Sequence, residues 1–215
     1  MSITLIGDVH GKYDKYKAIV DKNEYTIQLG DFGFSSHWRK LMEEVNPFHH
    51  LVIPGNHDCY DTAFYAPHYM GNFGVNTLND VEFFHIRGGI SIDRVYRVGE
   101  ELTGGPKTWW SQEEMNFTEM LACMEEYRKA KPRIVLSHAP PGFVCDVIHG
   151  NKHNILQKFK FHHGFKENTS LLGDELFKIH KPQYWVFGHH HRCWEREIDG
   201  TTFICLNELE TMSIE

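Results

Sequence analysis

Short apolar runs alternate with longer amphipathic stretches along the first part of the chain. Three of these runs, Ile3–Ile6, Thr26–Leu29 and Leu51–Ile53, are predicted strands, and each one stops at a glycine or at a Pro-Gly pair. The stretches between them, 12–22 and 37–45, are predicted helices. This βαβαβ order predicts a parallel or mixed sheet that is covered by helices.

The pattern changes in the second half of the chain. Residues 73–98 contain strand-like pieces around Gly88-Gly89, which predicts a more antiparallel order. Ser111 and Glu114 match a capping box and predict a helix that ends near residue 129. Further features are predicted: strands at Arg133–Leu136 and Tyr184–Phe187, a loop-rich segment at 141–169, a helix near 171–180, and a hairpin of Trp194–Ile198 and Thr201–Leu206 around Asp199-Gly200. The sequence shows no internal repeat or Pro/Gly-rich linker, which predicts one α/β domain over residues 1–215.

Composition narrows the class of protein. Apolar residues make up 41% and charged residues 24% of the 215-residue chain, as in ordinary globular proteins. The net charge of -7 argues against general capture of nucleic acid, which enters only in the role of a substrate. The chain opens on a predicted strand instead of a signal peptide, and its apolar runs are too short to span a membrane. Five scattered cysteines predict free thiols in a reduced, cytoplasmic protein.

Polar clusters follow five of the predicted strands. They are Gly7–Gly11, Gly30–Gly33, Gly55–Asp58, Ser137–Pro140 and Gly188–His191. Sites in open α/β sheets form beyond the carboxyl ends of the strands, so we expect these clusters to converge. Their aspartates, asparagine and histidines form an oxygen and nitrogen ligand set that suits Mn, Fe, Co, Ni or Zn.

Residue spacing within the clusters adds to this expectation. Asp8 and His10 are two residues apart, as are His189 and His191, so in an extended chain each pair faces one way. The carboxylate of Asp31 has two oxygens, which could bridge two cations about 3.5–4 Å apart.

In this order, the five clusters resemble those of the calcineurin-like metallophosphoesterase superfamily over residues 3–191. The resemblance implies a four-layer αββα sandwich of two mixed β-sheets flanked by helices, and two divalent transition-metal ions, with Mn first and Fe, Zn, Ni or Co as alternatives. Two ligand sets are implied: Asp8, His10, Asp31 and His191 for one metal, and Asp31, Asn56, His138 and His189 for the other. His57 matches the catalytic histidine of the superfamily.

Some residues depart from parts of the superfamily. Phosphoprotein phosphatases continue the second cluster with Asp-Arg-Gly, whereas Phe32-Gly33-Phe34 stands here, and the third cluster ends in Asp58 instead of Glu. The segment from Gly88 to Arg94, with Trp109-Trp110 and Glu113, resembles a branch of small bacterial and phage members.

The resemblance implies hydrolysis of a phosphate ester by a metal-activated hydroxide, with His57 as the general acid. Asp58, the next residue, is a candidate for orienting His57. Phosphatase and phosphodiesterase activities both remain open, as does the oligomeric state. A nuclease acting on single-stranded or short nucleic acid is an alternative. The non-enzymatic alternative is a silent scaffold, whose signature would be replaced ligands, and all the matched positions are intact.

A run of lysines and histidines occupies residues 147–166 without any Asp or Glu. Because it follows the cluster around His138, we expect it at the rim of the site. It is interpreted either as a solvated loop or as an anion-steering lid over the substrate.

Overall fold

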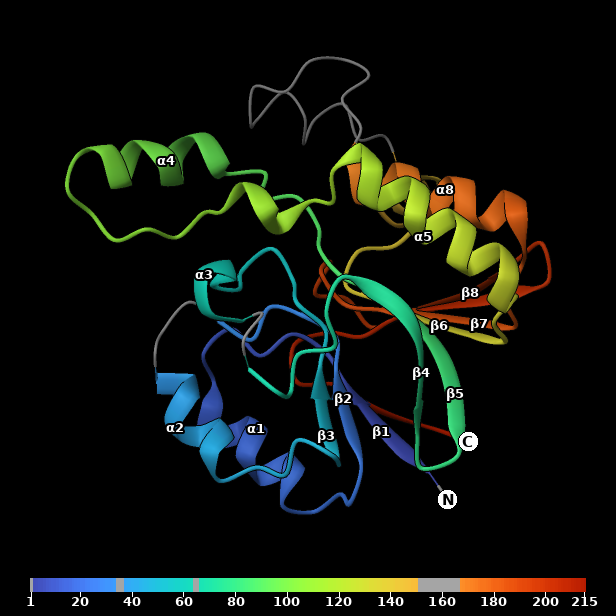
Figure 1. The fold of residues 1–215 in the computed structure, drawn as a ribbon, viewed down its shortest axis with the longest axis horizontal. Helices are drawn as coiled ribbons and strands as arrows, with labels where there is room; N and C mark the ends of the chain where they lie inside the picture. Colours follow the sequence, from blue (N-terminus) through green and yellow to red (C-terminus); the bar gives the residue numbers. More distant parts are fainter. Residues whose placement is uncertain (1, 34–36, 64–65, 151–166) are drawn as a thin grey trace.

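The computed structural model describes residues 2–33, 37–63, 66–150 and 167–215 and contains two mixed sheets (Figure 1). The four-stranded sheet has the order β10-β1-β2-β3, from Thr211–Ile214, Ile3–Ile6, Thr26–Gln28 and His50–Val52. The six-stranded sheet has the order β4-β5-β6-β7-β9-β8, from Phe73–Leu78, Val81–Ile86, Ile134–Ser137, Tyr184–Phe187, Thr201–Cys205 and Trp194–Ile198. In each sheet the central strands are parallel, and the antiparallel pairings lie toward the edges.

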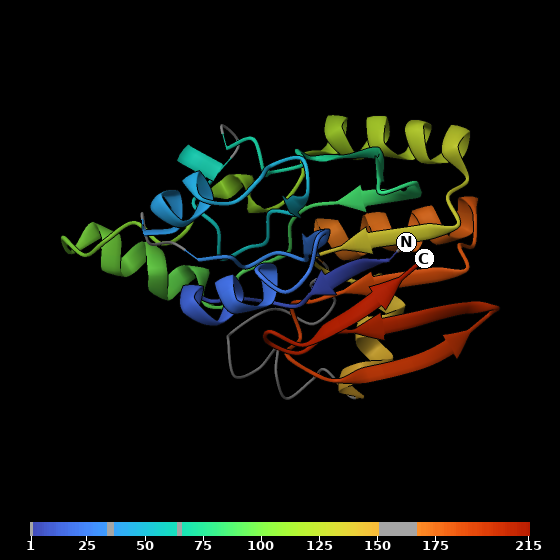
Figure 2. The ribbon, with the colours of Figure 1, turned by 90° about the horizontal axis from the view of Figure 1, so that it is seen from below.

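Helices cover the outer faces of both sheets. Helices α1 (Tyr13–Val20) and α2 (His37–Glu43) pack on the four-stranded sheet. Helices α5 (Phe117–Ala130), α6 (Gly142–His149) and α8 (Asn168–Ile179) pack on the six-stranded sheet, and the turned view of Figure 2 shows the succession of layers. This arrangement confirms the predicted αββα sandwich.

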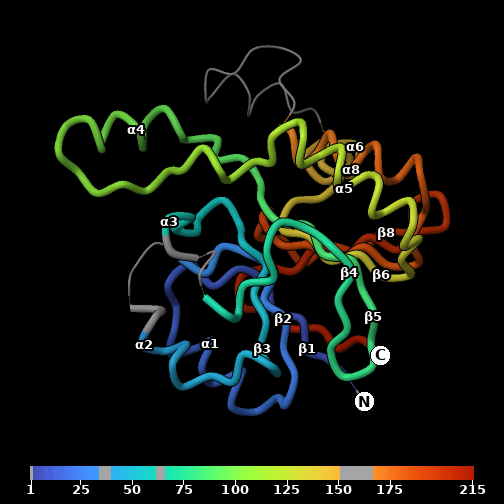
Figure 3. Tube along the Cα trace, viewed as in Figure 1, coloured from blue at the N-terminus to red at the C-terminus, as the bar shows by residue number. Residues whose placement is uncertain are grey.

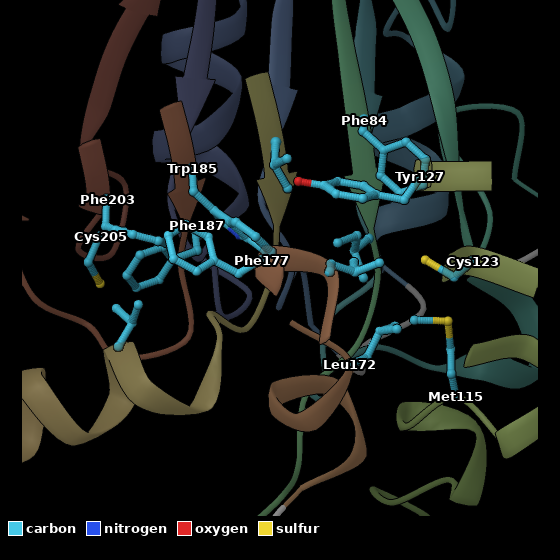
Figure 4. Close-up of a cluster of buried hydrophobic side chains, with 14 of the residues drawn as sticks. Phe84, Met115, Cys123, Tyr127, Leu172, Phe177, Trp185, Phe187, Phe203 and Cys205 are labelled. Atoms are coloured by element: carbon cyan, nitrogen blue, oxygen red, sulfur yellow. The ribbon is translucent and has the colours of Figure 1, made fainter. Parts of the chain in front are cut away.

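The alternation of side chains along the central strands produces three hydrophobic layers. Ile134 and Leu136 of β6 face the core between the sheets, whereas Val135 faces the helices. In β7, Val186 faces the core between the sheets and Trp185 faces the helices. Figure 4 shows the aromatic cluster that results beneath α5, α6 and α8.

Several predicted boundaries are corrected by the structure. The capping box is formed by Asn116 and Glu119 at the start of α5, so the predicted box at Ser111 is wrong. Residues Ser111–Glu113 form only a single 3-10 turn, η1. The first part of the predicted loop 141–169 is helix α6, while residues 151–166, with all the lysines of the cationic run, lie outside the described residues.

Three further elements escaped prediction. Helix α4 (Arg94–Leu102) follows β5, stands off the body of the molecule and has no buried residue (Figure 1). Strand β10 pairs with β1 and brings the two ends of the chain together (Figure 3). A short helix, α3 (Tyr60–Ala63), follows the cluster after β3. Within the described ranges, none of the helices combines the length and apolar character needed to cross a membrane.

Candidate metal centre

The first group of ligand-type side chains comprises Asp8, His10, Asp31 and His191. The Nε2 atom of His191 lies 2.9 Å from Asp8 Oδ2. The Nε2 atom of His10 lies 3.7 Å from Asp8 Oδ2 and 3.6 Å from Asp31 Oδ2. Because one potential ligand atom from each residue lies within 4.8 Å of all the others, the group can surround a single ion.

The second group comprises Asp31, His138 and His189, and Asn56 joins it. His138 Nε2 lies 3.2 Å from Asp31 Oδ1, 3.2 Å from His189 Nδ1 and 3.0 Å from Asn56 Oδ1. Asp31 therefore presents Oδ2 to the first group and Oδ1 to the second. A carboxylate shared in this way is the arrangement expected of a bridging ligand.

The chemistry of these donors fits divalent cations. The Nδ1 atom of His138 lies 2.7 Å from the carbonyl oxygen of Leu29, and a carbonyl only accepts. The ring proton therefore sits on Nδ1, and the Nε2 lone pair faces the second group. In the first group, the Nε2 atoms of His10 and His191 approach to 2.8 Å, where a cation could receive both lone pairs.

Charge at the centre also favours ligation. Asp8 and Asp31 are almost fully buried, and a buried carboxylate requires a compensating positive charge. Burial would raise the pKa of Asp31, but the imidazoles of His138 and His57 hold it well below its usual range. Each group would hold one cation through these residues.

The backbone places the ligands differently from the sequence-based expectation. His10, Asp31, His189 and His191 have φ angles of 48°, 57°, 67° and 49°, in the left-handed region. The extended conformation assumed for the two pairs is therefore wrong. Asp8 and His10 nevertheless share the first group, whereas His189 and His191 lie in different groups, as in the two sets that the resemblance implies. This conformation costs a non-glycine residue about 1–2 kcal/mol, and such strain concentrates at functional sites.

Two glycines permit the close approach of the strand ends. A Cβ atom on Gly30 would lie 2.2 Å from His138 Nδ1, and one on Gly188 would lie 2.2 Å from Asp8 Oδ1. Both distances are far shorter than a van der Waals contact. Any side chain at these positions would displace a residue of the centre.

The contacts of Asp58 are with backbone amides, and its predicted role of orienting His57 stays a prediction. Its Oδ1 accepts the N–H groups of Phe32 (2.9 Å) and Gly33 (3.1 Å). Its Oδ2 accepts those of Asp31 (3.1 Å) and Gly55 (2.7 Å). Burial and, to a smaller extent, the charge of Asp31 raise the pKa of Asp58 to about 7. The amide donors favour the charged carboxylate and so oppose this rise. Asp58 thus ties the loop after β2 to the loop after β3.

His57 lies at the edge of the first group, and Arg97 of α4 lies beside it. The backbone N–H of His57 donates to Asp31 Oδ1 at 2.7 Å, and the centroid of the His57 ring is 5.1 Å from that of the His10 ring. Arg97 Nη2 lies 3.2 Å from His57 Nδ1, while Arg97 Nε donates to Asp93 at 2.7 Å. Burial lowers the pKa of His57, and the positive charge of Arg97 lowers it further, whereas the negative charge of Asp31 raises it. The sequence analysis missed Arg97 because α4 was not predicted.

A second contribution missed by the sequence analysis lies behind Asn56. Its Nδ2 donates to Ser91 Oγ at 3.2 Å, and Ser91 Oγ donates to Glu113 Oε2 at 2.6 Å. All three residues are buried. The segment around Gly88-Gly89 was noticed in the sequence, but its link to a ligand was not.

The family model described as calcineurin-like phosphoesterase matches residues 1–193. The chain belongs to this family. The family is one of phosphoester hydrolases, and metal dependence is its usual property. The matched range contains both groups of ligand-type residues.

Two relatives of this calcineurin-like phosphoesterase illustrate the range of similarity. A lariat debranching enzyme from Entamoeba histolytica is 27% identical over 199 residues, which cover 85% of this chain and 52% of the relative. The chain thus spans about half the length of that protein. The phosphopantetheinyl hydrolase of Mycobacterium tuberculosis aligns with a TM-score of 0.51 and 14% identity, over 96% of this chain and 89% of that chain. At this identity, the second likeness shows the fold alone.

His190, the middle residue of the last cluster, turns away from both groups of this phosphoesterase. Its Nδ1 lies 2.9 Å from His149 Nε2, and its Nε2 lies 3.5 Å from Cys145 Sγ. Both partners belong to α6. His190 therefore packs between the ligand loop and the helix layer.

Proposed function

We propose that this protein hydrolyses phosphate esters at the two groups that share Asp31, with one divalent transition-metal ion in each group and manganese as the first candidate. The observation that carries the proposal is the division of the Asp31 oxygens, with Oδ2 toward His10 and Oδ1 toward His138. We also propose a cytoplasmic location, because all five cysteines are free thiols, as suits a reducing compartment.

The residues around the two groups have separate roles in this proposal. When bound, two such ions would neutralise the phosphoryl group and lower the pKa of the attacking water. His57 donates a proton to the departing oxygen from a backbone position held by Asp31. Arg97 only donates, so it holds the neutral His57 ring in place through Nδ1; once the ring is protonated, its lowered pKa makes it a stronger acid. The negative charge of a bound phosphate ester favours that protonated form.

A nucleic-acid phosphodiester is a second candidate substrate. The similarity to a lariat debranching enzyme over 85% of this chain favours it. The net charge of -7 limits such binding to contacts close to the site instead of a broad basic surface.

The test uses protein loaded with two equivalents of Mn²⁺. It is assayed against p-nitrophenyl phosphate, bis(p-nitrophenyl) phosphate and a short single-stranded oligonucleotide, with Asp31→Asn as the control variant. We expect metal-dependent hydrolysis that is lost in the variant. Faster turnover of the oligonucleotide than of both small esters would support the second candidate. Folded, fully loaded protein without activity on any substrate would overturn the proposal.

A further inference from the structure

Three buried residues from distant parts of the chain form a chain of hydrogen bonds behind the second group. Asn56 follows β3, Ser91 follows β5, and Glu113 ends η1. Their exposed fractions are 2%, 1% and 2%. Burial of a polar chain of this kind is stable only when each donor has an acceptor, so its hydrogen-bond directions are restricted.

Glu113 sets the direction of the chain. Its Oε1 accepts the backbone N–H of Ser91 at 2.9 Å, and its Oε2 accepts the Ser91 hydroxyl at 2.6 Å. Burial raises the pKa of Glu113 to about 7, and above that pH the carboxylate has no proton to donate, so the single hydroxyl proton of Ser91 is used by Glu113. The Ser91 oxygen can then only accept, and it accepts Asn56 Nδ2 at 3.2 Å.

The consequence falls on the Asn56 amide. With Nδ2 directed to Ser91, Oδ1 faces His138 Nε2 at 3.0 Å, on the side of the second group. The opposite orientation would point an N–H group at the cation and leave the oxygens of Asn56 and Ser91 facing each other. An amide ligates a hard or borderline cation through its oxygen, so only the observed orientation binds.

The Gly88-Gly89 turn brings the chain of hydrogen bonds to the site. The Gly88 N–H donates to Pro54 O at 2.8 Å, next to the loop that carries Asn56. A Cβ atom on Gly88, whose φ is 87°, would lie 2.2 Å from Glu113 O. The absence of a side chain here lets the η1 segment pack directly on the loop after β5.

We propose that Glu113 and Ser91 are positioning residues that hold the Asn56 amide with its oxygen toward the second metal. The inference rests on the proposed function in that Asn56 must be a ligand there. Outer partners of metal ligands typically contribute about 10- to 100-fold in metal affinity. The effect is confined to one of the two metals, because Asn56 belongs to one group only.

The experiment compares Glu113→Gln with the parent protein at pH 8, where Glu113 is ionised, using titration of Mn²⁺ against a chelating indicator to obtain both affinities. Glutamine keeps the size of Glu113, but its amide nitrogen would donate to Ser91 Oγ and release the hydroxyl proton. We expect one affinity to fall about 10- to 100-fold and the other to stay unchanged. Glu114→Gln is the matched control, because Glu114 accepts the Asn168 N–H at 2.6 Å away from the centre. It should leave both affinities unchanged.

Ser91→Ala gives an independent measurement and replaces Glu113→Gln if that variant does not fold. It should lower the affinity for the same metal. The double variant should bind that metal no more weakly than the single variant with the larger loss of affinity, because both residues act through Asn56. Unchanged affinities, or equal weakening of both metals, would overturn the inference. A parent protein that binds fewer than two ions would instead refute the proposed function.

Discussion

Asp58→Asn tests how the centre is held together. The substitution keeps the shape of the side chain but leaves one oxygen where there were two. Four backbone N–H groups point at Asp58, two at each oxygen, from Asp31 and Gly55 on one side and Phe32 and Gly33 on the other. In either orientation the asparagine amide would face two of these donors with its own N–H groups.

The expected cost follows from that count. A buried donor left without an acceptor costs about 1–3 kcal/mol, so two of them cost about 2–6 kcal/mol. This is a large part of the roughly 5–15 kcal/mol that stabilises a typical domain. Asparagine also removes the buried charge of Asp58, which burial and Asp31 disfavour, and this gain offsets part of the cost. With a urea dependence of about 3 kcal/mol/M, the unfolding midpoint should fall by no more than about 2 M.

The assay is urea unfolding of the metal-free protein, followed by circular dichroism at pH 8, above the pKa of about 7 of Asp58. Asp199→Asn is the control. Asp199 is exposed in the β8–β9 turn, has φ 51°, which asparagine tolerates, and pairs with Lys181 at 3.0 Å. It should change stability by less than about 1 kcal/mol.

Two results would refute this account of Asp58. An unfolding midpoint close to that of the parent would show that the carboxylate does not hold the loops. Normal stability combined with a reduced kcat would support the role first predicted from the sequence, in which Asp58 orients His57.

Three further outcomes are expected. Metal analysis of saturated protein should find two ions per chain, and Asp31→Asn should lose metal and nearly all activity while its circular dichroism stays unchanged; activity within a few-fold at full loading would contradict the shared ligand. His57→Asn should keep both metals and lose about 100- to 10,000-fold on an alkyl phosphate but far less on p-nitrophenyl phosphate, whose leaving group needs no proton; equal losses would instead assign His57 to charge stabilisation. Gly30→Ala should weaken metal binding, because a Cβ atom there would lie 2.2 Å from His138 Nδ1. Gly104→Ala is the control: its φ of 93° is close to the 98° of Gly30, but a Cβ atom would meet nothing within 4 Å, so only the stability should fall. Equal metal affinity in the two variants would refute the steric argument.

The sequence by itself determined the strands and the chemistry at their ends. Apolar runs of three or four residues predict buried strands, and all five predicted cluster strands were placed within one residue at each end. Two of them, Leu51–Ile53 and Arg133–Leu136, are shifted by one residue. These features are local, since they depend on side-chain alternation and on the conformational freedom of glycine. The seven candidate ligands are likewise named by residue type, and the structure brings all seven together.

The tertiary structure decided which partner each of these residues meets. The backbone is left-handed at His189 and at His191, and this conformation directs the two side chains to different groups, although their spacing in an extended chain would point them the same way. Asp58 faces backbone amides, and Glu113 reaches Asn56 through Ser91 across 57 positions of the chain. Such partners depend on how the two sheets and their connecting loops pack. No local pattern of residues records that packing, because a hydrogen bond is directed by the position of its acceptor in space and not by its distance along the chain.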